Sequence, residues 1–361
     1  MPHVNPLPAG PRRLGRRPAL DGFRGLAVLL VLADHAHVPL GAAWIGVDLF
    51  FVLSGFLISS LLLDELARSG RIDVRAFYLR RARRILPALA VLTVAVVGVS
   101  LSVHQLQDRW PVWAQAATTW TFTANAAAWL GHAPIGAFTP TWSLACEEQF
   151  YLLWPLALAA AHRAGWGPRR LLAALSAAVV ALVVAASAAS GALAGSTAFF
   201  SPLGRGAELL LGCALAVAWR YGRTPRWLAS RFAFGGAFAL GAVLAVRSPL
   251  GVEATYSVAA ACSAVVLLTL LEERPGGPLT RAFSVAPLRY TGRISYGLYL
   301  YNDAASRLLH HNLPGRPWWV VAPLLAAASF GCAALSYRFV EAGFLRRGGR
   351  PAARQEALGA A

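Results

Sequence analysis

Residues 20–40 read LDGFRGLAVLLVLADHAHVPL, an apolar run of membrane-span length with Arg24 near its start and His35 near its end. In an α-helix the eleven residues that separate these two side chains make three turns plus about 20°, so both project from one face, roughly 16 Å apart along the axis. Ionisable side chains on a membrane helix are costly unless they face a partner or a polar cavity. This helix face is therefore the first candidate for a functional site.

The rest of the chain repeats this apolar character. Of its 361 residues 57% are hydrophobic, and the apolar residues fall in blocks of about 20. The mean hydropathy of +0.54 is too high for a soluble domain. The sequence therefore predicts an all-α polytopic membrane protein.

The net charge of +17 comes from 33 arginines, with no lysine. Most of them lie in loops between the apolar blocks, as expected for cytoplasmic loops of a membrane protein. We therefore expect no nucleic-acid partner. Lipid headgroup phosphate or a charged cosubstrate fits this distribution better.

We expect about ten transmembrane helices, near residues 20–39, 44–63, 85–103, 142–161, 171–190, 203–219, 232–246, 254–271, 294–310 and 318–340. The segment 112–130 is only moderately apolar and is predicted to be a re-entrant or interfacial helix. Leaving out Arg24, 27 arginines then fall in segments predicted inside and five outside or at outer span ends. This asymmetry predicts that both termini are cytoplasmic.

The predicted organisation has three parts. Residues 1–19 are expected to form a disordered basic cytoplasmic tail, residues 20–345 a single membrane domain, and residues 346–361 a second cytoplasmic tail. The four cysteines lie inside apolar blocks without paired spacing, which predicts core residues. We expect no metal site, because His35 and His37 diverge at i, i+2 on a helix.

His35 is the candidate general base, because a neutral imidazole accepts protons near neutral pH. A carboxylate would orient its ring, and two candidates are the neighbouring Asp34 and a residue on another helix. Glu147 is the second candidate, since the predicted topology brings it to the same membrane face. The alternative is that Asp34 and His35 are only polar residues at headgroup level.

Glu147 and Glu148 open an otherwise apolar span, and Tyr151 shares a helix face with both. A carboxylate and an imidazole at one depth indicate acid–base chemistry. The alternative is a favourable acidic first turn of a helix.

Arg81 and Arg84 lie in the run YLRRARRILP, residues 78–87. Arginine binds phosphate with a planar fork, so these residues and Arg24 are candidates for holding the phosphates of a nucleotide-bearing cosubstrate. The alternative is a basic loop that sets topology and binds acidic lipid.

Asp48 lies deep in an apolar run and must pair or line a cavity. Arg205 and Glu208 are one turn apart and predict a local ion pair, at a depth that also allows acceptor contacts. The pair Ser54-Gly55 in the second predicted span indicates close helix packing.

Five motifs occur in one order over most of residues 20–345: LDGFRGLAVLLVLADH, WIGVDLFFVLSGFLIS, FYLRRARRILPAL, TWSLACEEQFYLLWP and GRISYGLYLYN. Together they resemble the acyltransferase-3 family of integral membrane O-acyltransferases. The resemblance implies transfer of an acyl group, commonly acetyl from acyl-CoA, to a hydroxyl of a carbohydrate or glycosylated metabolite.

By this resemblance, Arg24 and His35 match the essential pair of the family. Glu147 matches the glutamate of its WSLxxE motif, and Arg81 and Arg84 match its Arg-x-x-Arg. The chain departs from the pattern at Asn302, where relatives frequently carry His, and at Glu341-Ala-Gly, where they often have Glu-x-Pro. The side chains assigned to substrate contacts are Asp48, Glu148, Tyr151, Arg205, Glu208, Tyr299 and Asn302.

We therefore expect a multi-pass O-acyltransferase of a bacterial cell membrane, with acyl-CoA as cosubstrate and no tightly bound cofactor. The acceptor is a cell-surface polysaccharide or a glycosylated metabolite such as a macrolide. The rival class is a transporter or lipid flippase that uses Arg24, Asp48 and His35 as a polar path. The absence of an internal repeat argues against it.

Overall fold

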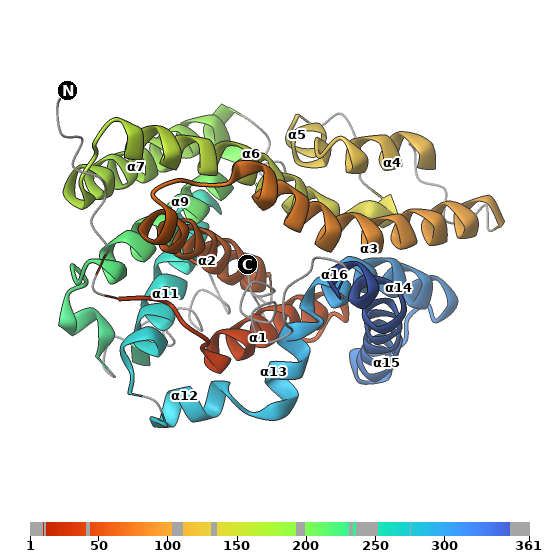
Figure 1. Cartoon of the computed structure of the whole chain (residues 1–361). Coiled ribbons are helices and arrows are strands. Elements are labelled where there is room, and N and C mark those ends of the chain that lie inside the picture. Colours follow the sequence, from red (N-terminus) through yellow and green to blue (C-terminus); the bar gives the residue numbers. More distant parts are fainter. Residues whose placement is uncertain are drawn as a thin grey trace.

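The computed structural model describes residues 12–40, 44–102, 111–130, 136–192, 199–230, 252–274 and 276–346, with Gly10, Phe234 and Gly235 (Figure 1). Every regular element within these described residues is a helix, and they contain no strand. The prediction of an all-α protein is confirmed.

The long helices agree with the predicted spans. They are α1 (Pro18–His35), α2 (Ile45–Ser69), α3 (Val74–Ser102), α6 (Thr141–Arg163), α7 (Pro168–Ala192), α9 (Pro202–Arg220), α11 (Val252–Glu272), α14 (Ser295–Asn312) and α15 (Trp318–Ser336). The remaining predicted span, 232–246, lies outside the described residues except for Phe234 and Gly235. The total of ten and the side on which the termini lie stay predictions.

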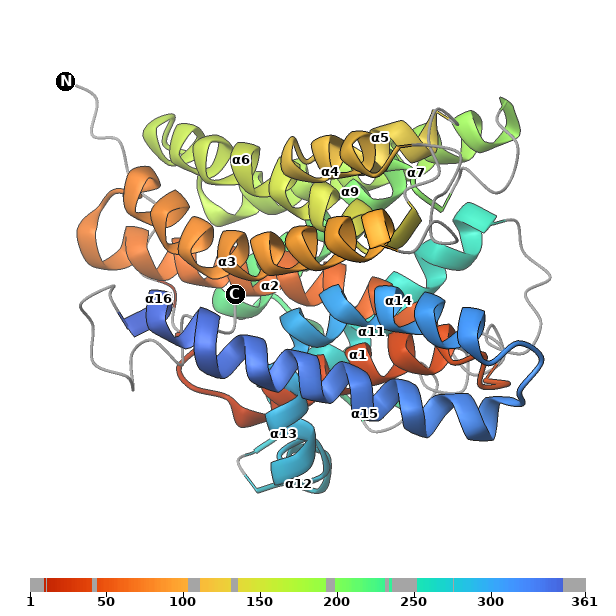
Figure 2. The same ribbon diagram turned by 90° about the vertical axis from the view of Figure 1, so that its right-hand side faces the viewer.

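Five helical segments of the described chain are long and apolar enough to cross a membrane. They are Ile45–Ser69, Val74–Ser102, Pro168–Ala189, Thr255–Glu272 and Trp318–Phe344, the last of which continues α15 through a π-helical turn (Tyr337–Glu341) into α16 (Ala342–Arg346). The multi-pass membrane character is thereby confirmed. In Figure 2, α1, α2, α3, α14 and α15 run in a similar direction through one bundle.

The segment 112–130 is not one continuous helix. It forms α4 (Val112–Trp120) and α5 (Ala124–Trp129), separated by Phe122 with φ 52°. Neither is long enough to span a bilayer. The short 3-10 turn Gly136–Phe138 then leads into α6.

The loop predicted before residue 294 contains two short helices, α12 (Pro278–Phe283) and α13 (Ala286–Arg293). Each begins with a proline in its first turn, a position that suits the fixed φ of proline. Both pack against α1. In Figure 2 they extend away from the bundle.

Part of the predicted disordered tail has defined contacts. Arg12 forms an ion pair with Glu272, and Arg17 donates a hydrogen bond to the backbone oxygen of Leu271 at 2.9 Å. Leu14 is buried in the same cluster as Trp219. From Arg12 onward, this segment is therefore packed against the ends of α9 and α11, because an apolar anchor and paired charges hold it there.

The most extensive helix contact in the described chain joins α2 and α9. A Cβ atom at Gly55 would overlap the backbone oxygen of Leu209, and one at Gly212 would overlap the backbone oxygen of Val52. The two backbones therefore approach at both glycines, as small residues allow in membrane bundles. The close packing predicted at Ser54-Gly55 is confirmed.

Gly55→Ala is expected to lower the free energy of unfolding by about 1–3 kcal/mol, because the added methyl group overpacks a backbone contact. The matched control is Gly98→Ala on α3, where a Cβ atom meets nothing within 4 Å. Thermal unfolding in one detergent measures both. A Gly55→Ala protein as stable as the Gly98→Ala protein would contradict this packing.

Candidate active site

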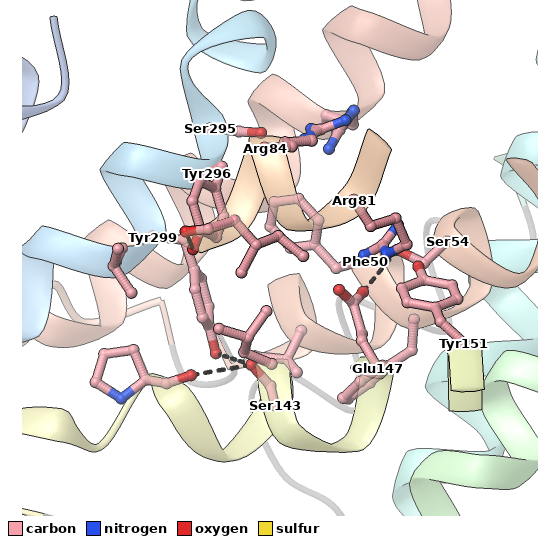
Figure 3. Close-up of a pocket in the computed structure, with 17 residues that line it drawn as sticks. Phe50, Ser54, Arg81, Arg84, Ser143, Glu147, Tyr151, Ser295, Tyr296 and Tyr299 are labelled. Atoms are coloured by element: carbon pink, nitrogen blue, oxygen red, sulfur yellow. Dashed lines mark hydrogen bonds between the residues drawn. The ribbon is translucent and has the colours of Figure 1, made fainter. Parts of the chain in front are cut away.

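A cavity with about 730 Å³ of empty space, part of it open to the outside, lies between α1, α2, α3, α6 and α14. Its polar lining residues are Arg24, Ser54, Arg81, Arg84, Ser143, Glu147, Tyr151, Ser295, Tyr296 and Tyr299. Figure 3 shows most of these side chains around the opening.

Helical spacing explains why these side chains converge. Arg81 and Arg84 are at i, i+3 on α3, and Glu147 and Tyr151 are at i, i+4 on α6. Each pair therefore projects from one face of its helix into the cavity. The predicted grouping of Glu147 with Tyr151 is present.

One end of the cavity is rich in arginine. Arg81 Nη2 lies 2.7 Å from Glu148 Oε1, and its guanidinium carbon lies 3.7 Å from the centre of the Tyr151 ring. Arg84 is close enough to Arg24 and Arg81 for their charges to interact. Three guanidinium groups and one carboxylate, that of Glu147, line the cavity, so its lining favours an anion.

Glu147 belongs to this arginine end. Its Oε1 accepts a hydrogen bond from Ser54 Oγ at 2.6 Å, and its charge interacts with those of Arg81 and Arg24 (Figure 3). The sequence-based expectation that Glu147 orients His35 has no contact to support it. The reason is helix packing: α6 packs against α5, α9 and α2, whereas α1 packs against α13, α2 and α14.

His35 lies outside the cavity lining and against α14. Its Nδ1 hydrogen bonds to Asn302 Oδ1, and its Nε2 lies 3.8 Å from Asp303 Oδ1. Ser306 Oγ donates a hydrogen bond to the backbone oxygen of His35 at 2.7 Å. The expected face of α1 is thus divided, with Arg24 at the cavity and His35 at the contact with α14.

Asp34 does not orient the His35 ring through a hydrogen bond. Its side chain is exposed, and it makes no side-chain hydrogen bond or ion pair within the described chain. The carboxylate that faces His35 is that of Asp303, which was not among the predicted site residues. The signal available was its position: Asp303 directly follows the GRISYGLYLYN motif.

Tyr299 and Asn302 have different surroundings. The hydroxyl of Tyr299 lies in the cavity wall, 2.5 Å from Ser143 Oγ. Asn302 is fully buried and contacts His35. Only Tyr299 of this pair is placed to touch a molecule in the cavity.

Asp48, Arg205 and Glu208 form a buried ionic cluster. Arg205 Nη1 lies 2.9 Å from Asp48 Oδ1 and 2.7 Å from Glu208 Oε1. The guanidinium is surrounded by the rings of Phe51, Trp142, Phe199 and Tyr256 at 4.1–5.8 Å. Asp48, Arg205 and Glu208 are at most 3% exposed, and none of the three lines the cavity. The predicted pairing is present, but the substrate contacts predicted for these residues have no open space.

The sequence profile of the family described as acyltransferase domain matches residues 17–338. Three bacterial relatives align over most of the chain. The peptidoglycan O-acetyltransferase OatA of Listeria monocytogenes is 29% identical over 353 residues, covering 92% of this chain and 56% of the relative. Bacillus subtilis YrhL is 31% identical over 357 residues, 90% of this chain and 54% of the relative. The O-acetyltransferase OatA of Staphylococcus aureus is 27% identical, with 92% and 57% covered.

The chain thus spans about half the length of the curated relatives it matches. No solved structure matches it. The bacterial relatives and the apolar helices together agree with the predicted location in a bacterial cell membrane.

Arg205→Met is expected to lower the free energy of unfolding by about 3–5 kcal/mol, because it leaves two buried carboxylates without their cation. The control is Arg338→Met, which removes an exposed arginine and should change stability little. Adding Asp48→Asn and Glu208→Gln to Arg205→Met should restore part of the loss. Thermal unfolding that shows equal stability for Arg205→Met and Arg338→Met would refute the role of the cluster.

Proposed function

This chain belongs to the acyltransferase-3 family, and from that membership we propose that it is an O-acyltransferase that moves an acetyl group from acetyl-CoA to a hydroxyl of a cell-envelope glycan. The names of the three relatives support the acetyl group, and those of the Listeria protein and, as a provisional name, the Bacillus protein support a glycan acceptor, peptidoglycan. For this reason a glycan is favoured over a macrolide sugar.

The observation that carries the proposal is the convergence of Arg24, Arg81 and Arg84 on one cavity. Coenzyme A is an anion whose phosphates suit guanidinium groups, and the partly buried position of these arginines strengthens the attraction. Glu147 and Glu148 balance part of this positive charge, so the arginines are held in place before the donor arrives. In this proposal Glu147 acts at the donor end.

The length of the donor suits the distance between Arg24 and His35. Arg24 and His35 are separated by roughly 16 Å along α1. A donor whose phosphates bind beside Arg24 can extend its thin pantetheine arm along the cavity toward the α14 end. Tyr299 and Ser143 line the cavity and offer hydroxyl groups to the amides of the arm.

His35 is the general base. In a direct transfer, its Nε2 removes the proton from the acceptor hydroxyl while the oxygen attacks the carbonyl carbon of the thioester. The carbon–sulfur bond then breaks, and the departing thiolate takes the proton from the imidazolium. The products are the acetyl ester and free coenzyme A. Asp303, 3.8 Å from Nε2, favours the transient positive charge.

His35→Ala is expected to lower kcat by about 100-fold or more, because general-base catalysis contributes about that much. The control is His311→Ala, which removes an exposed histidine from the last turn of α14. The assay uses the full chain in lipid nanodiscs with acetyl-CoA and a chitin oligosaccharide. Free thiol release gives the rate, and mass spectrometry detects the acetylated sugar. Ester formation by His35→Ala at the rate of His311→Ala would refute the role of His35.

Arg84→Gln is expected to raise the KM for acetyl-CoA about 10- to 100-fold, because one charged hydrogen bond contributes about 1.5–3 kcal/mol. Arg83→Gln is the matched control, since Arg83 is exposed on the same turn of α3. An equal KM in the two variants would show that the donor phosphates bind elsewhere.

A further inference from the structure

The amide of Asn302 has only one possible orientation in its hydrogen-bond network. Its Nδ2 donates to the backbone oxygens of Leu298 at 2.9 Å and Tyr299 at 2.8 Å. These two bonds use both amide hydrogens, and the side chain is fully buried. Its carbonyl oxygen, Oδ1, is therefore the atom that meets His35.

This orientation decides which nitrogen of His35 carries the hydrogen. Asn302 Oδ1 can only accept a hydrogen bond, so its partner Nδ1 of His35 must donate one. In a neutral imidazole the other nitrogen, Nε2, is then the proton acceptor. Asn302 thus selects one of the two tautomers.

Nε2 faces the carboxylate of Asp303 at 3.8 Å, which is too long for a hydrogen bond. That carboxylate is itself held, because its Oδ2 accepts a hydrogen bond from Arg307 Nε at 2.9 Å. Arg307 Nη2 in turn donates to Thr139 Oγ1 at 3.0 Å. Nε2 therefore keeps its lone pair beside a fixed negative charge.

We propose that Asn302 is a positioning residue that holds His35 in the Nδ1–H tautomer, with Nε2 directed at Asp303 as the proton-accepting atom. The inference rests on the proposed function, because it assumes that His35 is the base. In the transfer step the proton leaves the acceptor oxygen and binds Nε2. The resulting imidazolium donates its Nδ1–H to Asn302 and carries its new Nε2–H beside the Asp303 carboxylate.

The other ionisable groups near His35 are few in the described part of the chain. Asp34 and His37 are its neighbours in the sequence. The ring of His37 makes an edge-to-face contact with the ring of His310. His310 also contacts Ser306, which bonds the His35 backbone. Cys332 is the one ionisable side chain that α15 carries, and Asp48 near the start of α2 is paired with Arg205. Asn302 and Asp303 are the groups that meet the two ring nitrogens.

The test is the pH dependence of kcat/KM for acetyl-CoA, with a chitin oligosaccharide as acceptor and the full chain in nanodiscs. Asn302→Asp places a carboxylate on Nδ1–H, which stabilises the imidazolium and is expected to move the acid limb up by about one pH unit. Asp303→Asn removes the charge beside Nε2 and is expected to move the limb down. Opposite shifts from adjacent residues identify the two ring contacts.

Asn302→Leu removes the acceptor for Nδ1–H and is expected to lower kcat about 10- to 100-fold with little change in the KM for acetyl-CoA. Asn312→Leu is the matched control, because Asn312 lies on the same helix, is exposed, and donates to Leu308 O at 2.7 Å. The control should match the wild type in kcat and in the acid limb.

The outcomes separate this inference from the proposed function. A wild type without transferase activity defeats the proposed function and, with it, this inference. An active wild type with an inactive His35→Ala variant, but with an unshifted acid limb in Asn302→Asp and Asp303→Asn, defeats the inference alone. Should Asn302→Asp fail to fold in size-exclusion chromatography, Asp303→Asn decides: an unshifted acid limb overturns the inference, and a downward shift supports it.

Discussion

A charge inside an apolar bundle must be paired, and this constraint orders the whole structure. Arg205 satisfies it by joining Asp48 of α2 to Glu208 of α9 inside an aromatic enclosure. The same requirement pairs Arg81 with Glu148 beside the cavity and sets Asp303 opposite His35. Unpaired carboxylates or guanidiniums at these depths would cost several kcal/mol each. Apart from the positively charged lining of the cavity, the polar interior is therefore a set of separate, locally neutralised groups on helices that the apolar packing brings together.

The sequence predicts what depends on local periodicity. Apolar blocks identify nine helices of the described chain, and spacing along α3 and α6 brings Arg84 and Glu147 into the cavity. The partner of His35 depends instead on which helix packs against α1, and no periodicity within α1 contains that information. Glu147 was the plausible choice by depth alone, but α14 occupies the position beside His35. The packed segment after Arg12 and the helices α12 and α13 were likewise not predicted, because their structure depends on contacts with other helices.

The donor and acceptor ends of the proposed site have different physical characters. The arginine end is partly buried, positively charged and enclosed by five helices, which suits an anionic donor. The His35 end is partly exposed and is built from α1 and α14, which suits the approach of a large glycan hydroxyl. In the proposed reaction, helix α1 connects the two ends because it carries Arg24 at one end and His35 at the other.

The glycine contacts between α2 and α9 have a mechanical consequence. Two helices whose backbones meet at Gly55 and Gly212 cannot slide past each other without collision, so they form a rigid frame. Ser54 is part of this frame and fixes one wall of the cavity. Any widening that admits the proposed donor must then come from α1, α3, α6 or α14. In the proposed reaction, entry and release of the donor therefore belong to the walls that carry Arg24, Arg84, Glu147 and Tyr299.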